Sequence, residues 1–311
     1  MRENDLLRWI AATVPGHGAV PIGVGDDMAA VRLAGELALL KIDQCLDGVH
    51  FKLREHGPRA AGAKAIRRCL SDCAAMACLP AGALVAVALP READEELARE
   101  LLMGCRAAAE ALDCPLVGGD TALWDQRLAI TVAALGKMPD GRAPVRRSGA
   151  KAGDALIVSG ELGGSILGRH LTFEPRIRLA DALARAVPLH AMMDLSDGLA
   201  MDLPRLCEAS GVGAEVAASH VPAHADAEAL WARDGLPAGL HALIDGEDYE
   251  LLFAVAEDAL PILFPRPGAA PFGVKLTRIG TVTAERNVVL LDADDQRHPW
   301  PKGGWEHRSD A

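Results

Sequence analysis

The feature of this sequence that most restricts its fold is the repeated placement of aspartate directly after an apolar or glycine-rich segment. The segments with this arrangement are 25–27, 41–43, 70–72, 118–120 and 194–198. Carboxylates at the ends of strands and helices, beside small residues that let a ligand approach, suit a magnesium site that holds a polyphosphate. The pattern therefore predicts nucleotide chemistry.

Length and charge limit the possible classes of protein. The chain has 311 residues, which exceeds what one hydrophobic core usually serves, so we expect about two domains. Its formal net charge of -11 argues against nucleic acid and against an anionic membrane as partners, because neither is attracted to such a surface. An anionic nucleotide would need metal ions to bridge it to the aspartates.

Short apolar segments alternate with helical patterns, which predicts a mixed α/β fold. The predicted strands are 37–42, 83–89, 128–135, 155–158, 251–255 and 288–291. The predicted helices are 58–76, 92–112, 176–186 and 199–209. A polar, turn-forming segment at 139–144 separates two halves that each hold strands and helices. We therefore predict an N-terminal domain over 1–140 and a C-terminal domain over 141–311, with an irregular segment at 299–311.

Cysteine usage and the apolar segments bear on location. The seven cysteines are odd in number and form no CxxC pair, so we expect free, buried thiols in a reducing cytoplasm. A metal or redox site at Cys69, Cys73 and Cys78 is the alternative. The segment 1–15 is predicted to be an amphipathic helix rather than a signal peptide. The uncharged segment 73–90 is broken by proline and glycine, which favours a helix end, a turn and a buried strand over a membrane span.

Several common catalytic motifs are absent. The sequence has no GxxxxGK[ST] phosphate loop, no His-Arg-Asp or Asp-Phe-Gly of protein kinases, and no GxSxG elbow. Gly23-Val24-Gly25 begins like a dinucleotide fingerprint, but two aspartates follow where a pyrophosphate would be repelled. The acidic segments are what remains.

Any one of these aspartates could simply cap a helix or a turn. Their joint pattern is harder to explain in that way. Asp194 and Asp197, with Ser196 between them, lie at a predicted strand-to-helix junction, where short side chains can hold a metal while the helix N-terminus faces a phosphate. The segment 246–250 places three more acids ahead of a predicted strand.

Taken in order, these segments resemble the thiamine-monophosphate kinase family. The matching motifs are GVGDD at 23–27, DGVHF at 47–51, LSDCAAM at 70–76, GGDT at 118–121, RSGAKAGD at 147–154, DLSDGL at 194–199, SGVGA at 210–214 and GEDYELLF at 246–253. The family belongs to a superfamily with aminoimidazole ribonucleotide synthetase, selenophosphate synthetase and a hydrogenase-maturation protein. The resemblance extends over nearly the whole chain.

The resemblance implies a two-domain α/β fold of the aminoimidazole ribonucleotide synthetase type, whose N-terminal domain binds metal and ATP and forms a homodimer through a shared β-barrel. It also implies direct transfer of the γ-phosphoryl group of ATP to thiamine monophosphate, with Mg2+. Such a transfer depends on in-line positioning and charge neutralisation more than on covalent chemistry.

Roles for individual residues follow from the matching motifs and are expectations of the resemblance. The implied metal ligands, with Asp26 supporting the others, are Asp26, Asp27, Asp43, Asp72, Asp120, Asp194 and Asp197. The implied nucleotide-binding residues are Gly119, Asp120, Arg147 and Ser196. Arg147 would also stabilise charge on the transferring group, and Arg147 and Asp197 are the expected catalytic residues. The implied substrate contacts are His50, Glu247 and Trp305, and without its motif His50 would equally suit a hydrogen-bonded histidine at a strand end.

The sequence departs from the family pattern at several positions. Lys41-Ile42 stands where the family usually has a Ser/Thr pair that serves metal and phosphate. Lys41 could supply a fixed positive charge in place of a magnesium ion, or could point outward, since neighbours on a strand alternate faces. Arg68-Cys69 replaces the common Val-Asn, and Asp245 replaces a glycine.

Two alternatives to this kinase remain open. A superfamily relative could act on another small molecule, although no cysteine precedes Cys45 and the chain does not end in cysteine, unlike the selenium and hydrogenase relatives. A homologue could also bind nucleotide without turnover, an alternative that Lys41-Ile42 favours and the retained acids oppose.

Overall fold

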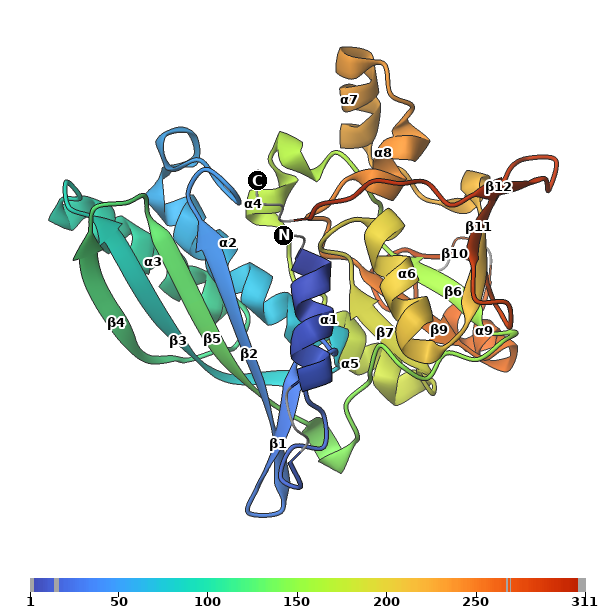
Figure 1. Cartoon of the computed structure of the whole chain (residues 1–311), viewed down its shortest axis with the longest axis horizontal. Helices are drawn as coiled ribbons and strands as arrows, with labels where there is room; N and C mark the ends of the chain where they lie inside the picture. Colours follow the sequence, from blue (N-terminus) through green and yellow to red (C-terminus); the bar gives the residue numbers. More distant parts are fainter. Residues whose placement is uncertain (1–2, 14–16, 267, 269, 307–311) are drawn as a thin grey trace.

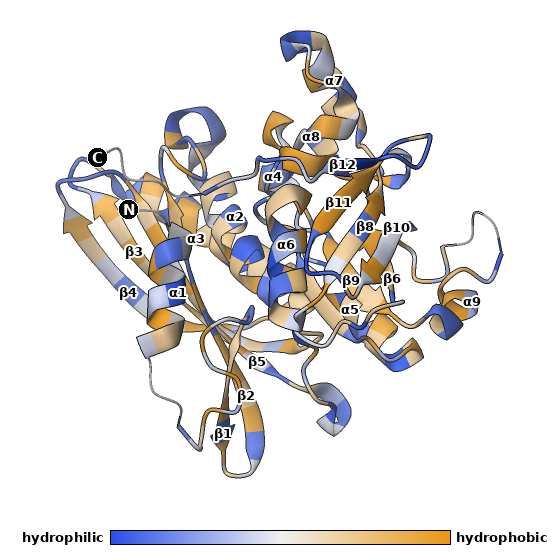
Figure 2. Ribbon diagram, turned by 45° about the vertical axis from the view of Figure 1, so that its right-hand side comes forward, coloured by the Kyte–Doolittle hydropathy of each residue, from blue (hydrophilic) through white to orange (hydrophobic). Residues whose placement is uncertain are grey.

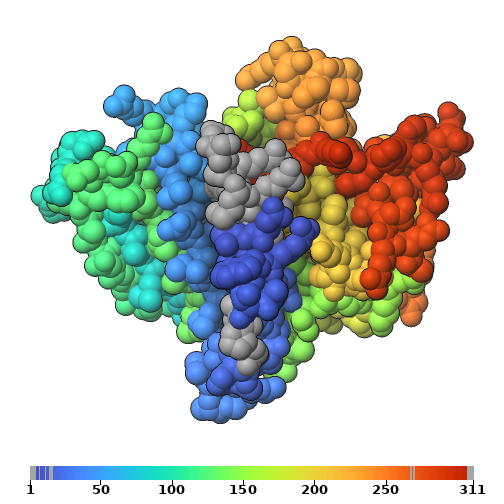
Figure 3. Space-filling view, in the orientation of Figure 1, coloured from blue at the N-terminus to red at the C-terminus, as the bar shows by residue number. Residues whose placement is uncertain are grey.

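The computed structural model describes residues 3–13, 17–266, 268 and 270–306. Two groups of elements, each built on its own sheet, stand side by side, and helix α1 (Glu3–Thr13) lies between them at the front (Figures 1 and 3). The predicted helix at 1–15 and the predicted irregular segment at 299–311 both extend beyond the described residues. Within the described part, α1 is helical as predicted, and 300–306 is irregular after a short strand at 297–299.

The first sheet has five strands in the order β1-β2-β5-β3-β4. Their bounds are β1 (Ala29–Leu33), β2 (Glu36–Leu46), β3 (Leu79–Pro90), β4 (Leu116–Trp124) and β5 (Ala129–Lys137). Helices α2 (Leu53–Ala75) and α3 (Glu95–Ala111) pack against each other on one side of this sheet (Figure 1). The regular part of α2 begins at Pro58, after a left-handed Gly57 with φ 77°, because proline is well suited to the first turn of a helix.

The second sheet has seven strands in the order β12-β11-β8-β10-β6-β9-β7. Their bounds are β6 (Ala155–Ser159), β7 (Ala191–Asp194), β8 (Gly213–Ala217), β9 (Leu251–Val255), β10 (Leu276–Thr283), β11 (Val288–Leu291) and β12 (Arg297–Pro299). The accompanying α-helices are α4 (Arg169–Thr172), α5 (Ile177–Ala186), α6 (Leu199–Ser210), α7 (Ala225–Asp234), α8 (Ala238–Ile244) and α9 (Leu260–Leu263). Short 3-10 helices lie at Pro139–Gly141, Ser165–Leu167, Ala218–His220 and Glu257–Ala259.

Helix α2 joins the two halves. It packs on β2 and β5 of the first sheet and also contacts α4, α5 and β7 of the second half. Its buried Ile66 and Leu70 belong to one apolar cluster with Ile157 and Phe253 of the second sheet. A residue on α2 can therefore meet a residue at the end of β7.

The other face of the first sheet carries exposed apolar side chains. Leu40 and Ile42 of β2, Leu84 of β3 and Leu135 of β5 lie on this face, because Leu40 pairs with Leu135, while Ile42 and Leu84 both pair with Ala133. Figure 2 shows hydrophobic residues along β2 and β3. The sheet ends at β1 and β4 within the described residues, so a closed barrel would need further strands.

Most of the predicted secondary structure is confirmed. Each predicted strand overlaps an observed one, each predicted helix overlaps α2, α3, α5 or α6, and 73–90 forms a helix end, a turn and β3. Strand β4 was missed because its two glycines and aspartate disfavour a strand, but pairing with β3 overrides that preference. All seven cysteines are free and buried, as predicted. Among the described residues, no helix has the length and apolarity needed to cross a membrane.

Candidate active site

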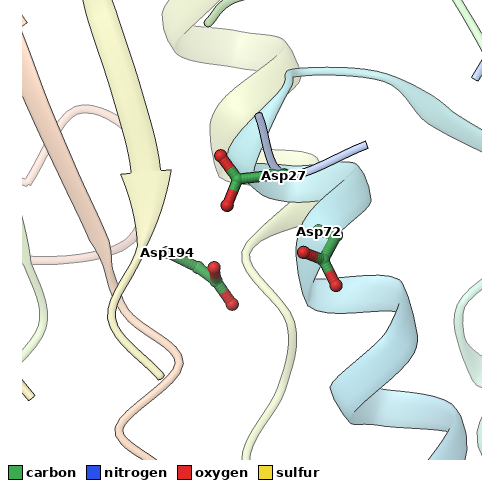
Figure 4. A group of neighbouring side chains, drawn as sticks. All are labelled: Asp27, Asp72 and Asp194. Atoms are coloured by element: carbon green, nitrogen blue, oxygen red, sulfur yellow. The ribbon is translucent and has the colours of Figure 1, made fainter. Parts of the chain in front are cut away.

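Three buried aspartates meet at the junction of the two halves. Asp27 precedes β1, Asp72 lies near the end of α2, and Asp194 is the last residue of β7. One carboxylate oxygen from each lies within 4.8 Å of the others, and Figure 4 shows the three side chains around a common space. Oxygen donors in this arrangement suit a hard divalent cation such as Mg2+. The structure thus brings together three of the predicted metal ligands from segments far apart in the sequence.

Asp194 has a raised pKa in this cluster. Burial and the neighbouring charge of Asp27 raise the pKa of Asp194 to about 6. The Ser71 hydroxyl donates to Asp194 Oδ2 at 2.5 Å and partly opposes that rise. Asp194 therefore binds a proton more readily than an ordinary carboxyl group, unless a cation takes the proton's place.

Arg147 holds the first aspartate of the cluster. Its Nε and Nη2 donate to the two carboxylate oxygens of Asp27, at 3.0 and 2.7 Å. This bidentate contact leaves the Nη1 group of Arg147 without a hydrogen bond to any described residue. The Asp26 carboxylate does not join the cluster: it accepts from Arg146 Nε and from the backbone N–H of Arg147, both at 3.1 Å. Asp26 thus anchors the segment that carries Arg147 and lies outside the cluster of three.

Beside the cluster, β2 and α2 are joined by two ion pairs. The Lys41 ammonium group lies 2.7 Å from Asp72 Oδ1, and Arg68 Nε lies 3.4 Å from Asp43 Oδ2. Although burial opposes the charged form, Asp72 and Asp43 raise the pKa of Lys41 above its ordinary value. Lys41 therefore points inward, whereas Ile42 points to the opposite face, with 67% of its surface exposed. Of the two interpretations of Lys41, the structure supports the fixed charge.

A second buried network surrounds Glu247. The fully buried Lys64 of α2 contacts Glu247 Oε1 at 2.7 Å and His170 Nδ1 at 2.7 Å, and it donates to the His50 carbonyl oxygen. Burial acts to raise the pKa of Glu247, but His170 and Lys64 outweigh it and lower that pKa to about 2. Glu247 also has a left-handed φ of 62°, a strained value for a non-glycine residue and one often kept at functional sites. Two predicted substrate contacts, His50 and Glu247, are thus tied to one lysine.

His50 has a further backbone contact. Its Nδ1 accepts from the Leu46 N–H at 3.0 Å, so Nε2 carries the proton in the neutral ring. His50 is therefore a hydrogen-bonded histidine at a strand end, as expected from the residue without its motif. Its carbonyl oxygen also accepts from Lys64.

The loop after β7 carries Ser196 and Asp197. The Ser196 carbonyl accepts from the Glu247 N–H at 2.7 Å, and the Asp197 carbonyl accepts from the Trp305 N–H at 3.0 Å. Arg205 pairs with the Asp197 carboxylate and with the buried Asp202. The predicted residues Ser196, Asp197, Glu247 and Trp305 thus share one backbone network at the start of α6.

Gly119 and Asp120 are not brought to this cluster. Both lie exposed on β4, the edge strand of the first sheet, where Asp120 pairs with Ala86. In this register Asp120 lies on the same face as Ile42, opposite the face of Lys41 and Asp43. A Cβ atom on Gly119 would lie 1.9 Å from the Val85 carbonyl oxygen, so close packing of β4 on β3 already requires glycine there.

Lys64, His170 and Arg205 also belong to these networks and were not among the predicted site residues. Lys64 had a detectable signal, because it is a lone charge within the segment 60–65 of a predicted helix, whose other residues are alanine and glycine. His170 had none, since its partners lie on α2 and on a loop whose path only the fold defines. Arg205, by contrast, stands three residues after Asp202 in the predicted helix 199–209, a spacing that allows an ion pair. Asp245, one of the departures, accepts from the Gly164 N–H at 2.7 Å and contacts His241.

Comparison with known proteins identifies the class of protein to which the chain belongs. Residues 25–138 match the family model "AIR synthase related protein, N-terminal domain", and residues 148–292 match the corresponding C-terminal domain. The fold is thus that of an AIR synthase related protein. A hydrogenase maturation protein, HypE in a complex with HypF, has the same fold, with a TM-score of 0.73 at 19% identity over 94% of this chain and 98% of that chain.

Closer relatives define the particular family. Thiamine-monophosphate kinase of Rhodopirellula baltica is 40% identical, covering 90% of this chain and 89% of the relative, and that of Bacillus subtilis is 32% identical over 99% of both. A solved structure described as "AaThiL complexed with AMPPCP and TMP" matches with a TM-score of 0.84 at 29% identity, over 99% of this chain and 97% of that chain. The chain belongs to the thiamine-monophosphate kinase family.

Proposed function

We propose that the acidic junction is where this chain transfers the γ-phosphoryl group of ATP to thiamine monophosphate, which yields thiamine diphosphate and ADP. The observation that carries this assignment is the meeting of Asp27, Asp72 and Asp194 within 4.8 Å, with Arg147 fixed beside them. Family membership supports a kinase acting on thiamine monophosphate, and the similar structure with AMPPCP and TMP supports the two substrates.

The carboxylates fit Mg2+, because each offers hard oxygen donors and three of them already converge. When bound, Mg2+ would neutralise phosphate charge. We assign the metal ligands to Asp27, Asp43, Asp72, Asp120, Asp194 and Asp197, with Asp26 supporting them. The chain's own contribution is a rigid arrangement, since Ser71, Arg147 and Arg205 hold Asp194, Asp27 and Asp197.

Arg147 is the proposed group for charge on the transferring phosphoryl. Its bidentate bond to Asp27 fixes the plane of the guanidinium and leaves Nη1 to donate to an anion. Asp197 is the second proposed catalytic residue, held in place by Arg205. Phosphoryl transfer of this kind needs positioning and charge compensation, which these contacts can provide.

The two substrates are assigned to two sets of residues around the cluster. Gly119, Asp120 and Ser196 would contact ATP. His50, Glu247 and Trp305 would contact thiamine monophosphate, and the ionised Glu247 suits the cationic thiazolium ring of that substrate. The 48% exposed Trp305 can cover the ring, since its backbone is tied to Asp197.

A homodimer would complete the nucleotide side. The exposed apolar face of the first sheet, formed by Leu40, Ile42, Leu84 and Leu135, suits burial against a second copy. Asp120 lies on that same face, so a second copy would enclose it. We place the domain boundary at 140/141, between the two sheets, and the seven free, buried thiols support a cytoplasmic location.

The test is to incubate the purified chain with Mg2+, ATP and thiamine monophosphate and to follow thiamine diphosphate and ADP by chromatography. We expect equal formation of both products that stops when Mg2+ is removed. ADP without thiamine diphosphate would contradict the proposed acceptor. Neither product, despite measurable ATP binding, would show that the chain binds nucleotide without turnover.

A further inference from the structure

Two protein cations lie among the acids at the edge of the active site, at positions where the family usually has uncharged residues. Lys41 pairs with Asp72, one of the three clustered carboxylates, and Arg68 faces the neighbouring Asp43. All four side chains are at least three-quarters buried, with exposed fractions between 9% and 25%. Charges this poorly hydrated need compensation from nearby groups.

The two pairs form a regular arrangement between a strand and a helix. Lys41 and Asp43 are two residues apart on β2 and so point to the same face, about 7 Å apart. Arg68 and Asp72 are four residues apart on α2 and so lie on the same side, about 6 Å apart. The spacings match, so each positive group on one element faces a negative group on the other.

The two contacts differ in quality. Lys41 Nζ makes a hydrogen bond of 2.7 Å to Asp72 Oδ1, which uses one of the two lone pairs of that oxygen and places a positive charge beside it. Arg68 makes no hydrogen bond through Nε or Nη1 to a described residue, so it acts on Asp43 through its charge. Lys41 is therefore the group that competes directly with a metal ion for a ligand atom.

We propose that Lys41 is a built-in cation: it takes the place of one divalent ion at Asp72, with Arg68 neutralising the adjacent Asp43. The two side chains together carry the charge of one Mg2+. Lys41 cannot leave the site as a metal ion can, so one part of the acid cluster is neutralised before any metal binds. The inference rests on the proposed function of the junction as a metal site.

The test is to count metal ions on the full chain, with Mn2+ as the probe and free Mn2+ measured by electron paramagnetic resonance. Lys41→Thr introduces the residue type usual in the family and frees Asp72 Oδ1. We expect this variant to bind one more Mn2+ per chain than the wild type, while Lys41→Arg, which keeps the charge, binds the wild-type number. Lys275→Thr removes an exposed lysine paired with Glu161 and should leave the number unchanged.

The outcomes separate this inference from the proposed function. If the wild type and Lys41→Thr bind the same number of Mn2+ ions, the built-in cation is refuted and the proposed metal site is not. No bound Mn2+ on either protein overturns the metal site itself, and the inference with it. If Lys41→Thr does not fold, the wild type decides: a crystal soaked in Mn2+ should show no anomalous peak at bonding distance from Asp72 Oδ1, and a peak there refutes the inference.

Discussion

The acidic junction and strand β4 both carry residues expected to bind the nucleotide and its metals, but they differ in how far the single chain completes them. At the junction, Asp27, Asp72 and Asp194 are buried and held by side chains from other segments. On β4, Gly119 and Asp120 are exposed at a sheet edge. Asp120 lies on the apolar outer face of the sheet, apart from the three clustered acids.

The two regions therefore differ in how much of the binding site one chain arranges before any ligand binds. The junction is already arranged within one chain, because α2 packs on both sheets and brings distant acids together. In the proposed homodimer, the β4 side would gain partners from the ligand and from a second copy. Changes at the junction should therefore affect chemistry and stability, whereas changes on the exposed face should act through assembly.

The largest effect is expected from Asp194→Asn. The substitution keeps the size of a buried side chain but removes its charge, so kcat should fall by about 10²–10³-fold, as when one preorganised electrostatic group is lost. The measurement is kcat in steady-state assays at saturating concentrations of both substrates. The partly exposed Asp292→Asn serves as the control, and a wild-type kcat for Asp194→Asn would show that the junction is not the reaction site.

Lys64→Met tests the second buried network. It leaves Glu247 buried without its cation, which should lower the free energy of unfolding by about 3–5 kcal/mol, measured by urea denaturation. KM for thiamine monophosphate should rise while KM for ATP stays constant. The double variant Lys64→Met/Glu247→Gln removes the unpaired charge and should recover part of the stability. If the double variant is no more stable than Lys64→Met, the unpaired charge of Glu247 is not the cause of the lost stability.

Ile42→Lys tests whether the exposed apolar face of the first sheet is a dimer interface. A charge at the centre of the apolar face should weaken a dimer by at least about tenfold in Kd, or about 1.4 kcal/mol, with little change in the stability of the monomer. Light scattering after size-exclusion chromatography measures the mass. Ile262→Lys, at an exposed isoleucine of α9 in the second half, is the matched control. Dimers of unchanged affinity would exclude this face as the interface.

The smallest expected effect is a pH dependence at Asp194. Its pKa of about 6 in the folded chain exceeds the ordinary 3.8, so the folded chain holds more protons between these values. Without metal, this group therefore contributes stability that is lost as pH rises through that window. Mg2+ must displace the proton, so the rise in Tm caused by Mg2+ should be smaller at about pH 5 than at about pH 7.5, by about 2–4 °C. Equal increments in thermal unfolding would contradict the assignment of Asp194 as a ligand.

Much of the fold and part of the site could be predicted from the sequence. Strands with strong apolar patterns, such as β9 and β11, were predicted with their observed bounds. Strand β10 was missed because Gly280 interrupts its pattern, yet that glycine permits close contact with Glu215 of β8 and lies at the register shift between β10 and β6. The acids of the site were identified by motif, but their distances were not accessible, since residues 27, 72 and 194 are separated by long stretches of chain.

The sequence by itself determined the mixed α/β class, the family and the types of chemical group available, because apolar periodicity and motif order are local properties. Only the tertiary structure decided which acids converge, that Lys41 faces Asp72 while Ile42 faces outward, and that Lys64 joins His50 to Glu247. These outcomes depend on how α2 packs between two sheets. Such packing is set by the whole core and not by any one segment.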